Sequence, residues 1–178
     1  MELQLLDWIQ SNLRYDFFDQ LMTVITALGN GAIIWIIIAA CLLVSPKNRK
    51  AGIHVMIAVL LGYVIGDLVL KNAFGRARPF VNIDITLLIS KPLEYSFPSG
   101  HTLSGFAASV SLLFYSKKLG LTSMILASII AFSRLYLYVH YPTDILGGII
   151  AGVGVAFLGK VIIDWIYHKG NINKSKDE

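Results

Sequence analysis

The longest stretch of the sequence without a charged residue, residues 20–46, is the feature that most constrains the fold. Within it, residues 31–44 are almost entirely Ile, Ala, Leu and Trp. About 20 residues of this kind form a helix that crosses the apolar part of a bilayer. The whole chain is 56% hydrophobic and only 15% charged, whereas soluble domains average about 25% charged residues. The sequence therefore predicts an integral membrane protein, and its low polarity excludes an intrinsically disordered chain.

Four more apolar runs follow the first, so we expect an all-α bundle of five membrane-spanning helices. The expected spans are residues 21–45 (or 29–45), 51–70, 99–115, 119–139 and 144–163. The first span is expected to kink at Gly29-Asn30-Gly31. Because the spans fill most of the 178 residues, we expect a single membrane-embedded domain over 1–178, with the helical bundle at 20–167 and a polar tail at 168–178.

The first 19 residues differ from the rest, because charged residues interrupt their apolar ones. Leu6, Ile9, Leu13 and Phe17 recur at intervals that place them on one face of a helix. We therefore expect 1–19 to form an amphipathic helix on the membrane surface. The alternative is that this segment pairs with residues 20–30 into a sixth span. The segment lacks the basic start and compact apolar centre of a cleavable signal peptide.

Basic residues divide between the two ends of the expected bundle. Eight lie in two turns and the tail, namely Lys47, Arg49, Lys50, Lys117, Lys118, Lys169, Lys174 and Lys176. Six lie at the other end, namely Arg14, Lys71, Arg76, Arg78, Lys91 and Arg134. The positive-inside rule places the end with eight, and with it the C-terminal tail, in the cytoplasm. Because these residues are scattered rather than gathered in a stripe, we expect the lipid bilayer and no nucleic acid as partner.

Three polar clusters fall at the end of the bundle that has fewer basic residues. They are K-N-A-F-G-R-A-R-P from Lys71 to Pro79, P-S-G-H from Pro98 to His101, and Ser133-Arg134 followed by His140 and Asp144. Successive spans alternate in direction, so we expect all three clusters on the same side of the membrane. Ionisable residues at such positions are rare and usually functional.

The residue types of these clusters suit a phosphate ligand. Lys71, Arg78 and Arg134 supply fixed cations, and guanidinium groups bind phosphate oxygens with two hydrogen bonds at once. Ser99 and Gly100 lead into a helix, and the free N–H groups at a helix start bind phosphate. The glycine also lets the backbone approach a ligand closely. We therefore expect these five residues to hold the phosphate.

Two histidines and a carboxylate supply the reactive groups. His101 and His140 titrate near neutrality and are able to serve as nucleophile, acid or base. Asp144, four residues after His140, would hold one ring nitrogen and leave the other free to attack. The set predicts phosphoryl transfer without a metal or cofactor, since the histidines lack further ligands at the usual spacing. The single Cys41 excludes a Cys-cluster metal site and an internal disulfide.

Other polar and small residues are expected to have structural roles. Four are interpreted as residues of the membrane interface, namely His54, Arg76, Lys91 and His168. Asp67 and Lys71, four positions apart, would form an ion pair on a helix. The glycines between residues 147 and 154 predict close packing of the last span within the monomer. The loop at 78–97 is apolar enough to cover the site or guide a lipid tail, or it packs as a connector.

The three clusters, in this order, resemble the type 2 phosphatidic acid phosphatase superfamily, which also includes vanadium haloperoxidases. They read K-x6-R-P at 71–79, P-S-G-H at 98–101 and S-R-x5-H-x3-D at 133–144. The resemblance implies an all-helical membrane phosphatase acting on lipid phosphates or pyrophosphates, usually with six spans where we count five. It implies that His140 forms a phosphohistidine, that Asp144 orients it and that His101 protonates the leaving group. The implied phosphate ligands are Lys71, Arg78, Ser99, Gly100 and Arg134.

The resemblance also implies a substrate and a location. Small bacterial members of the family commonly convert undecaprenyl pyrophosphate to undecaprenyl phosphate outside the cytoplasm. We therefore expect an enzyme of the plasma membrane with an extracytoplasmic active site and no required protein partner. Phosphatidylglycerophosphate, phosphatidate and diacylglycerol pyrophosphate are the rival substrates.

Activities of other classes remain open beside the hydrolase. A lipid-linked phosphotransferase would use the same phosphohistidine and a different acceptor. A haloperoxidase built on vanadate is disfavoured by the apolar composition, because those relatives are soluble. In a membrane scaffold or transporter the phosphate-handling residues would have no purpose.

Overall fold

A computed structural model describes residues 1–83 and 85–174 of the chain, and these residues form helices, turns and loops without a strand. The helices are α1 (Glu2–Leu13), α2 (Asp16–Gly29), η1 (Asn30–Ala32), α3 (Ile33–Val44), α4 (Arg49–Gly62), the π-helix η2 (Tyr63–Leu70), α5 (Lys71–Phe74), η3 (Pro79–Asn82), α6 (Gly100–Leu113), α7 (Lys117–Tyr136) and α8 (Pro142–Lys174). The prediction of an all-α fold is confirmed for this part of the chain.

Four helical segments are long and apolar enough to cross a membrane, namely Asp16–Val44, Arg49–Phe74, Lys117–Tyr136 and Pro142–Lys169. They coincide with four of the five expected spans and extend the first one back to Asp16. The expected span at 99–115 is the 14-residue helix α6, which is shorter than the roughly 20 residues that cross a bilayer. The bundle therefore contains five helices at the expected places, of which four have the length and composition of a span.

Helix α6 lies at the centre of the bundle, packed against α4, α7 and α8. Small side chains allow this, because Gly105, Ala107 and Ala108 bring neighbouring helices close. On α8, a Cβ placed at Gly152 would lie 2.6 Å from the carbonyl oxygen of Leu103. The prediction of close glycine packing within the monomer is confirmed for Gly147, Gly148 and Gly152, whereas a Cβ at Gly154 would meet nothing within 4 Å.

The kink predicted in the first span lies between α2 and α3. Gly31 has a φ of 56° and Ala32 a φ of 57°, both in the left-handed region. Glycine adopts this conformation without the steric cost that a Cβ brings. The turn at η1 therefore changes the direction of the first span and leaves Asn30 at the bend.

The N-terminal helix is shorter than expected and packs differently. Helix α1 ends at Leu13, since Arg14 and Tyr15 are extended, and Phe17 belongs to α2. The prediction of one helix through residue 19 is wrong at this boundary. Leu6 and Ile9 are buried, and Ile9 packs with residues of α2 and of the α7–α8 turn. Leu6 and Ile9 therefore face protein rather than lipid, whereas Leu3, Leu5 and Trp8 of the same helix are exposed. A position of α1 on the membrane surface stays a prediction.

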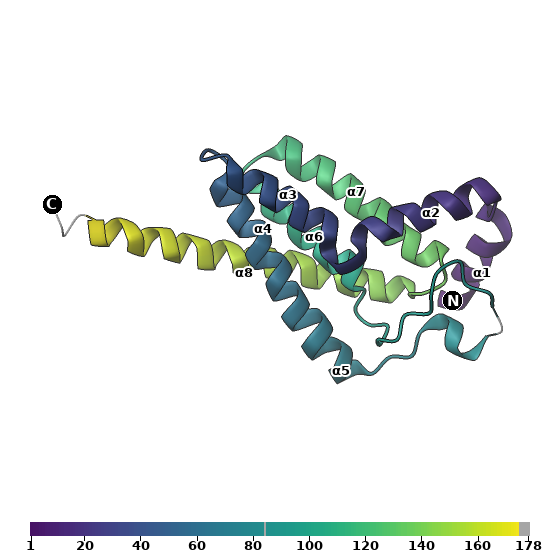
Figure 1. The fold of residues 1–178 in the computed structure, drawn as a ribbon. Coiled ribbons are helices and arrows are strands. Elements are labelled where there is room, and N and C mark those ends of the chain that lie inside the picture. The colour runs from purple at the N-terminus through teal and green to yellow at the C-terminus, as the bar shows by residue number, and fades with distance from the viewer. Residues whose placement is uncertain (84, 175–178) are drawn as a thin grey trace.

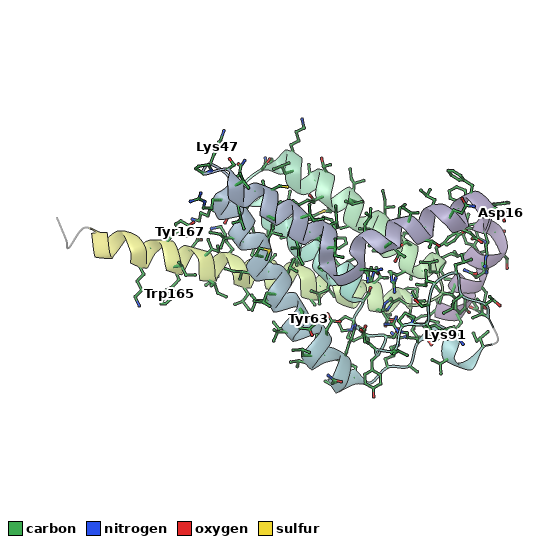
Figure 2. The ribbon with its side chains drawn as sticks, viewed as in Figure 1. Asp16, Lys47, Tyr63, Lys91, Trp165 and Tyr167 are labelled. Carbon is green, nitrogen blue, oxygen red and sulfur yellow. The ribbon has the colours of Figure 1, made fainter. Side chains whose placement is uncertain are left out.

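The two ends of the bundle differ in charge. The α3–α4 turn, the start of α7 and the C-terminal part of α8 lie at one end, while α1 and the loop before α6 lie at the other (Figure 1). Lys47 and Lys91, labelled in Figure 2, mark these two ends. Helix α8 continues past the expected end at residue 163 to Lys174 and projects from the bundle (Figure 1). The expected polar tail at 168–178 is thus helical through Lys174, and its last four residues lie outside the described part.

Candidate active site

A cavity of about 970 Å³ opens beside the kink and receives residues from all three polar clusters. Six of the eight predicted site residues line it, namely Lys71, Arg78, Gly100, His101, Arg134 and His140. The other two, Ser99 and Asp144, are fully buried behind the wall. The fold therefore brings together residues that the sequence places on three separate loops and helix ends.

Helix ends position each of these side chains. Lys71 begins α5, and Arg78 lies in the extended segment that follows it. Gly100 and His101 are the first two residues of α6. Arg134 is in the last turn of α7, and His140 lies in the turn before α8. The helix ends that hold them lie away from the α3–α4 turn, where Figure 2 labels Lys47 (Figures 1 and 2).

His140 is held between an arginine and a carboxylate. Its Nδ1 lies 3.3 Å from Asp144 Oδ2, and its Nε2 lies 3.1 Å from Arg78 Nη1. A guanidinium only donates, so Nε2 accepts and the ring proton belongs on Nδ1, where it is donated to Asp144. Burial lowers the pKa of His140, and the cations of Arg78 and Arg134 lower it further, whereas the hydrogen bond and charge of Asp144 act to raise it. The imidazole is therefore neutral, with the lone pair on Nε2.

The Asp144 carboxylate is fully buried and accepts several hydrogen bonds. Ser96 Oγ donates at 2.5 Å and the backbone N–H of Tyr141 at 2.8 Å, both to Oδ2. Arg76 Nη1 donates to Oδ1 at 2.7 Å. The interpretation of Arg76 as an interfacial anchor is therefore wrong, and Ser96 is a site residue that the sequence analysis missed. Both lie two positions before a predicted motif residue, Arg78 and Pro98, and this proximity is the signal that would have found them.

Three nearly buried cations surround the cavity, namely Lys71, Arg78 and Arg134. Lys71 Nζ forms the expected ion pair with Asp67 and a second one with Glu94 Oε2 at 3.0 Å. Arg134 Nη1 donates to Thr26 Oγ1 at 2.6 Å, while its Nε has no hydrogen-bond partner among the described residues. A buried donor without a partner is costly, so this arrangement favours an anion in the cavity.

His101 faces the kink of the first span. Its Nε2 lies 3.0 Å from Asn30 Oδ1, and a Cβ placed at Gly29 would lie 2.6 Å from the ring carbon Cδ2. The absence of a side chain at Gly29 thus makes room for the imidazole. Asn30 was missed as a site residue, although a polar amide between two glycines in an uncharged run is a visible signal.

Two further interpretations of single residues need correction. His54 is not interfacial, since it is completely buried with Nε2 2.8 Å from the carbonyl oxygen of Ala156. Lys91 lines the cavity rather than serving only as an anchor, and its side chain is exposed. His168 is exposed on α8.

The loop at 78–97 both packs and lines the site. Phe80, Leu87, Leu88 and Ile89 pack on a cluster formed by α1, α2 and the α7–α8 turn. Five consecutive residues, 88–92, together with Glu94, form part of the cavity wall. The loop is therefore both a packed connector and part of the wall of the site.

The cavity changes character away from the cations. Its far wall is apolar and is formed by Ile36 of α3 and by Met56, Val59 and Leu60 of α4. Tyr63, the first residue of η2, also lines the cavity, and Figure 2 labels it between α4 and α5. A charged pocket that continues into an apolar groove fits an amphiphile with an anionic head.

Comparison with known proteins agrees with this geometry. The family model of the PAP2 superfamily matches residues 51–167. The chain is 36% identical over 127 residues to an undecaprenyl-diphosphatase of Sulfolobus acidocaldarius, a match that covers 70% of this chain and 61% of that protein. It is 33% identical to undecaprenyl-diphosphatase BcrC of Bacillus subtilis, covering 79% of this chain and 72% of that one.

The fold also resembles a solved structure, the transmembrane PAP2 type phosphatidylglycerolphosphate phosphatase from Bacillus subtilis. The TM-score is 0.71 at 25% identity, and the match covers 92% of this chain and 87% of that chain. The family model covers well over half of the sequence, including all three polar clusters. The chain therefore belongs to the PAP2 superfamily.

Proposed function

We propose that this protein is a metal-independent membrane phosphatase that hydrolyses a lipid phosphate or pyrophosphate through a phosphohistidine on His140. The observation that carries this proposal is the neutral, buried His140, whose Nε2 faces a cavity lined by Lys71, Arg78 and Arg134. A nucleophile whose lone pair faces a cluster of cations is what an in-line displacement at phosphorus requires.

The first step transfers the terminal phosphoryl group to the enzyme. His140 Nε2 attacks phosphorus, the P–N bond forms, and the P–O bond to the leaving group breaks. In the substrate complex, where the charge of the phosphate favours the imidazolium form, His101 donates a proton to the departing oxygen. Asp144 stabilises the positive charge that develops on the ring through its contact with Nδ1.

The second step releases phosphate. Water attacks the phosphohistidine and gives a proton to His101, and the P–N bond breaks to return neutral His140. In both steps Lys71, Arg78 and Arg134 balance the charge on the equatorial oxygens, together with the free N–H groups at the start of α6 from Gly100 onward. The N–H of Ser99 donates instead to the carbonyl oxygen of Asp144 at 3.1 Å and so ties the start of α6 to α8.

The preferred substrate is undecaprenyl pyrophosphate, converted to undecaprenyl phosphate. Two relatives that match at 36% and 33% identity carry the name undecaprenyl-diphosphatase, and the apolar groove along α3 and α4 has the character needed for a polyprenyl tail. Phosphatidylglycerophosphate is the second candidate, because the fold matches the phosphatase that bears that name.

The site is proposed to face the extracytoplasmic side of the plasma membrane. The α3–α4 turn and the starts of α4 and α7 lie at the end of the bundle opposite the site (Figure 1). These segments contain Lys47, Arg49, Lys50, Lys117 and Lys118. Basic residues gather in cytoplasmic turns, so this end and the C-terminal tail are assigned to the cytoplasm.

The purified protein, assayed against a panel of pyrophosphate and monophosphate lipids, tests the proposal. We expect release of inorganic phosphate, fastest from undecaprenyl pyrophosphate, and an acid-quenched phosphoenzyme that is absent in His140→Ala. Phosphate moved to another acceptor without release would indicate a phosphotransferase. Full turnover by His140→Ala would overturn the assignment of the nucleophile.

A further inference from the structure

Arg76 connects the N-terminal helix to the buried carboxylate behind the nucleophile. Its Nη1 donates to Asp144 Oδ1 at 2.7 Å and to Thr143 Oγ1 at 2.6 Å. Its Nη2 donates to Glu2 Oε2 at 2.7 Å. The guanidinium carbon lies 4.0 Å from the centre of the Tyr141 ring, so the group is also held from its face.

Glu2 uses both of its carboxylate oxygens at this junction. While Oε2 accepts from Arg76, Oε1 accepts from the backbone N–H and the hydroxyl of Thr143, at 3.1 and 2.7 Å. The start of α1 is thus bonded to the first turn of α8, 141 positions later in the sequence. This contact explains why α1 lies over the site end of the bundle, where Figure 1 shows the N-terminus.

The two oxygens of Asp144 have different partners. Oδ2 accepts hydrogen bonds from Ser96 Oγ, the backbone N–H of Tyr141 and His140 Nδ1. Among the described residues, the hydrogen bonds to Oδ1 come from Arg76 alone. A fully buried carboxylate needs a compensating charge, and Arg76 supplies it while fixing the plane of the carboxylate by holding the oxygen that His140 does not contact.

We propose that Arg76, oriented by Glu2, is a positioning residue for the His140–Asp144 pair, and that α1 is therefore part of the catalytic apparatus. The inference rests on the proposed role of His140 as nucleophile. Loss of Arg76 frees Asp144 to rotate, which weakens its contact with Nδ1 and lets Nε2 leave the direction of attack. Misplacement of a reacting group by about 1 Å costs on the order of 100-fold in rate.

The test compares Arg76→Gln, Arg76→Lys and Glu2→Gln with a matched control, Arg14→Gln. Arg14 is also partly exposed, follows α1 directly and pairs with Asp19 at 3.2 Å, away from Asp144. We expect Arg76→Gln to lower kcat by about 100-fold with KM changed less than about threefold, because the substrate's own contacts remain. Arg76→Lys should recover part of kcat, Glu2→Gln should lose about 5- to 10-fold, and Arg14→Gln should stay within about twofold of the parent.

A double-mutant cycle separates positioning from a merely structural role. If Glu2 acts through Arg76, Glu2→Gln has no further effect on kcat in the Arg76→Gln background. Guanidinium ion added at millimolar concentration should restore part of the kcat of Arg76→Ala, and urea should not. Size-exclusion profiles and circular dichroism in detergent establish that each variant is folded.

Different outcomes overturn different statements. Turnover by His140→Ala overturns the proposed function. If His140→Ala is inactive while Arg76→Gln keeps its kcat, or loses activity only through KM, the positioning role is wrong and the proposed function stands. If Arg76→Gln does not fold, the kcat values of Glu2→Gln and Arg76→Lys test the positioning role instead. An unchanged kcat in both variants overturns the inference.

Discussion

Arg78 Nη1 lies 3.1 Å from His140 Nε2, so an obligate donor faces the ring nitrogen that is proposed to attack phosphorus. The same guanidinium donates through Nη1 to the carbonyl oxygen of Val139 at 2.9 Å and through Nε to that of Glu94 at 2.8 Å. These backbone contacts hold Arg78 in place beside the cavity. Arg78 thus sets the tautomer of His140 and adds positive charge to the cavity wall.

The pH dependence of catalysis follows from this contact. Because burial and the nearby cations hold the pKa of His140 below its usual value of about 6.5, the imidazole stays neutral as the pH falls through 6. We expect no loss of kcat/KM from protonation of His140 between pH 7 and 6. Arg78→Gln removes a cation, so the pKa of His140 rises and the acid limb moves to higher pH. A profile of kcat/KM from pH 4.5 to 8 measures the acid limb of the parent enzyme and of Arg78→Gln. If the acid limb of the parent enzyme lies at pH 6.5 or above, the conclusion that His140 is neutral is wrong.

Glu94 forms ion pairs with two of the cations that are proposed to bind the phosphate of the substrate. Its carboxylate lies 3.0 Å from Lys71 Nζ and 4.0 Å from Arg78 Nη2, and the side chain is 71% exposed. The hydrogen bond from Lys71 holds the pKa of Glu94 below its usual range, so the group is charged. We expect Glu94→Gln to lower KM, and the inhibition constant of inorganic phosphate, by about 2- to 5-fold, because an exposed ion pair is worth up to about 1 kcal/mol. Asp16→Asn, an exposed acid on α2, is the control, and an increased KM in Glu94→Gln would refute the competition.

Catalysis should not depend on a divalent metal. Lys71, Arg78 and Arg134 together provide the positive charge that metal ions supply at many phosphoryl-transfer sites. We expect full activity after dialysis against EDTA and inhibition by orthovanadate, which adopts the geometry of the transferring phosphoryl group. Activity lost in EDTA and restored by Mg²⁺ would show that a metal takes part.

The polar residues that line the cavity could be found from the sequence because the chain has so few of them. In an apolar chain, Lys71, Arg134 and Asp144 stand out at span ends, and alternation of the spans places them together. The residues that hold them could not be found in this way. Ser96 and Arg76 meet Asp144 only because the segments before α6 and after α5 pack against the start of α8. This packing is tertiary, and no local pattern encodes it.

The ends of the helices were hard to predict for a similar reason. The apolar face through Leu6, Ile9 and Leu13 predicts a helix correctly, but periodicity alone cannot show that Arg14 and Tyr15 are extended. Nor does an apolar face tell whether protein or lipid covers it. The burial of Leu6 and Ile9 shows that protein covers this part of α1, and that burial depends on tertiary contacts.

Lys91 offers a direct test of sidedness. It is exposed at the site end of the bundle, opposite Lys47 (Figure 2). In a Cys41→Ser background, we expect Lys91→Cys in intact cells to react with a membrane-impermeant maleimide, and Lys47→Cys to react only after the cells are opened. The reverse pattern would invert the proposed topology and remove the support for an extracytoplasmic substrate.

Alanine substitutions at two glycines of α8, Gly152 and Gly154, distinguish the effect of helix packing on stability from that of helix propensity. At Gly152, a Cβ would lie 2.6 Å from the carbonyl oxygen of Leu103 and 3.1 Å from the backbone nitrogen of Ala107, whereas at Gly154 it would meet nothing within 4 Å. Backbone atoms of α6 cannot move aside as a side chain can, so we expect Gly152→Ala to destabilise the protein by about 1–3 kcal/mol. Gly154→Ala should be neutral or stabilising by up to about 1 kcal/mol, because alanine favours the helix. Thermal unfolding in detergent measures both, and equal effects of the two substitutions would mean that α6 and α8 are not in the close contact described.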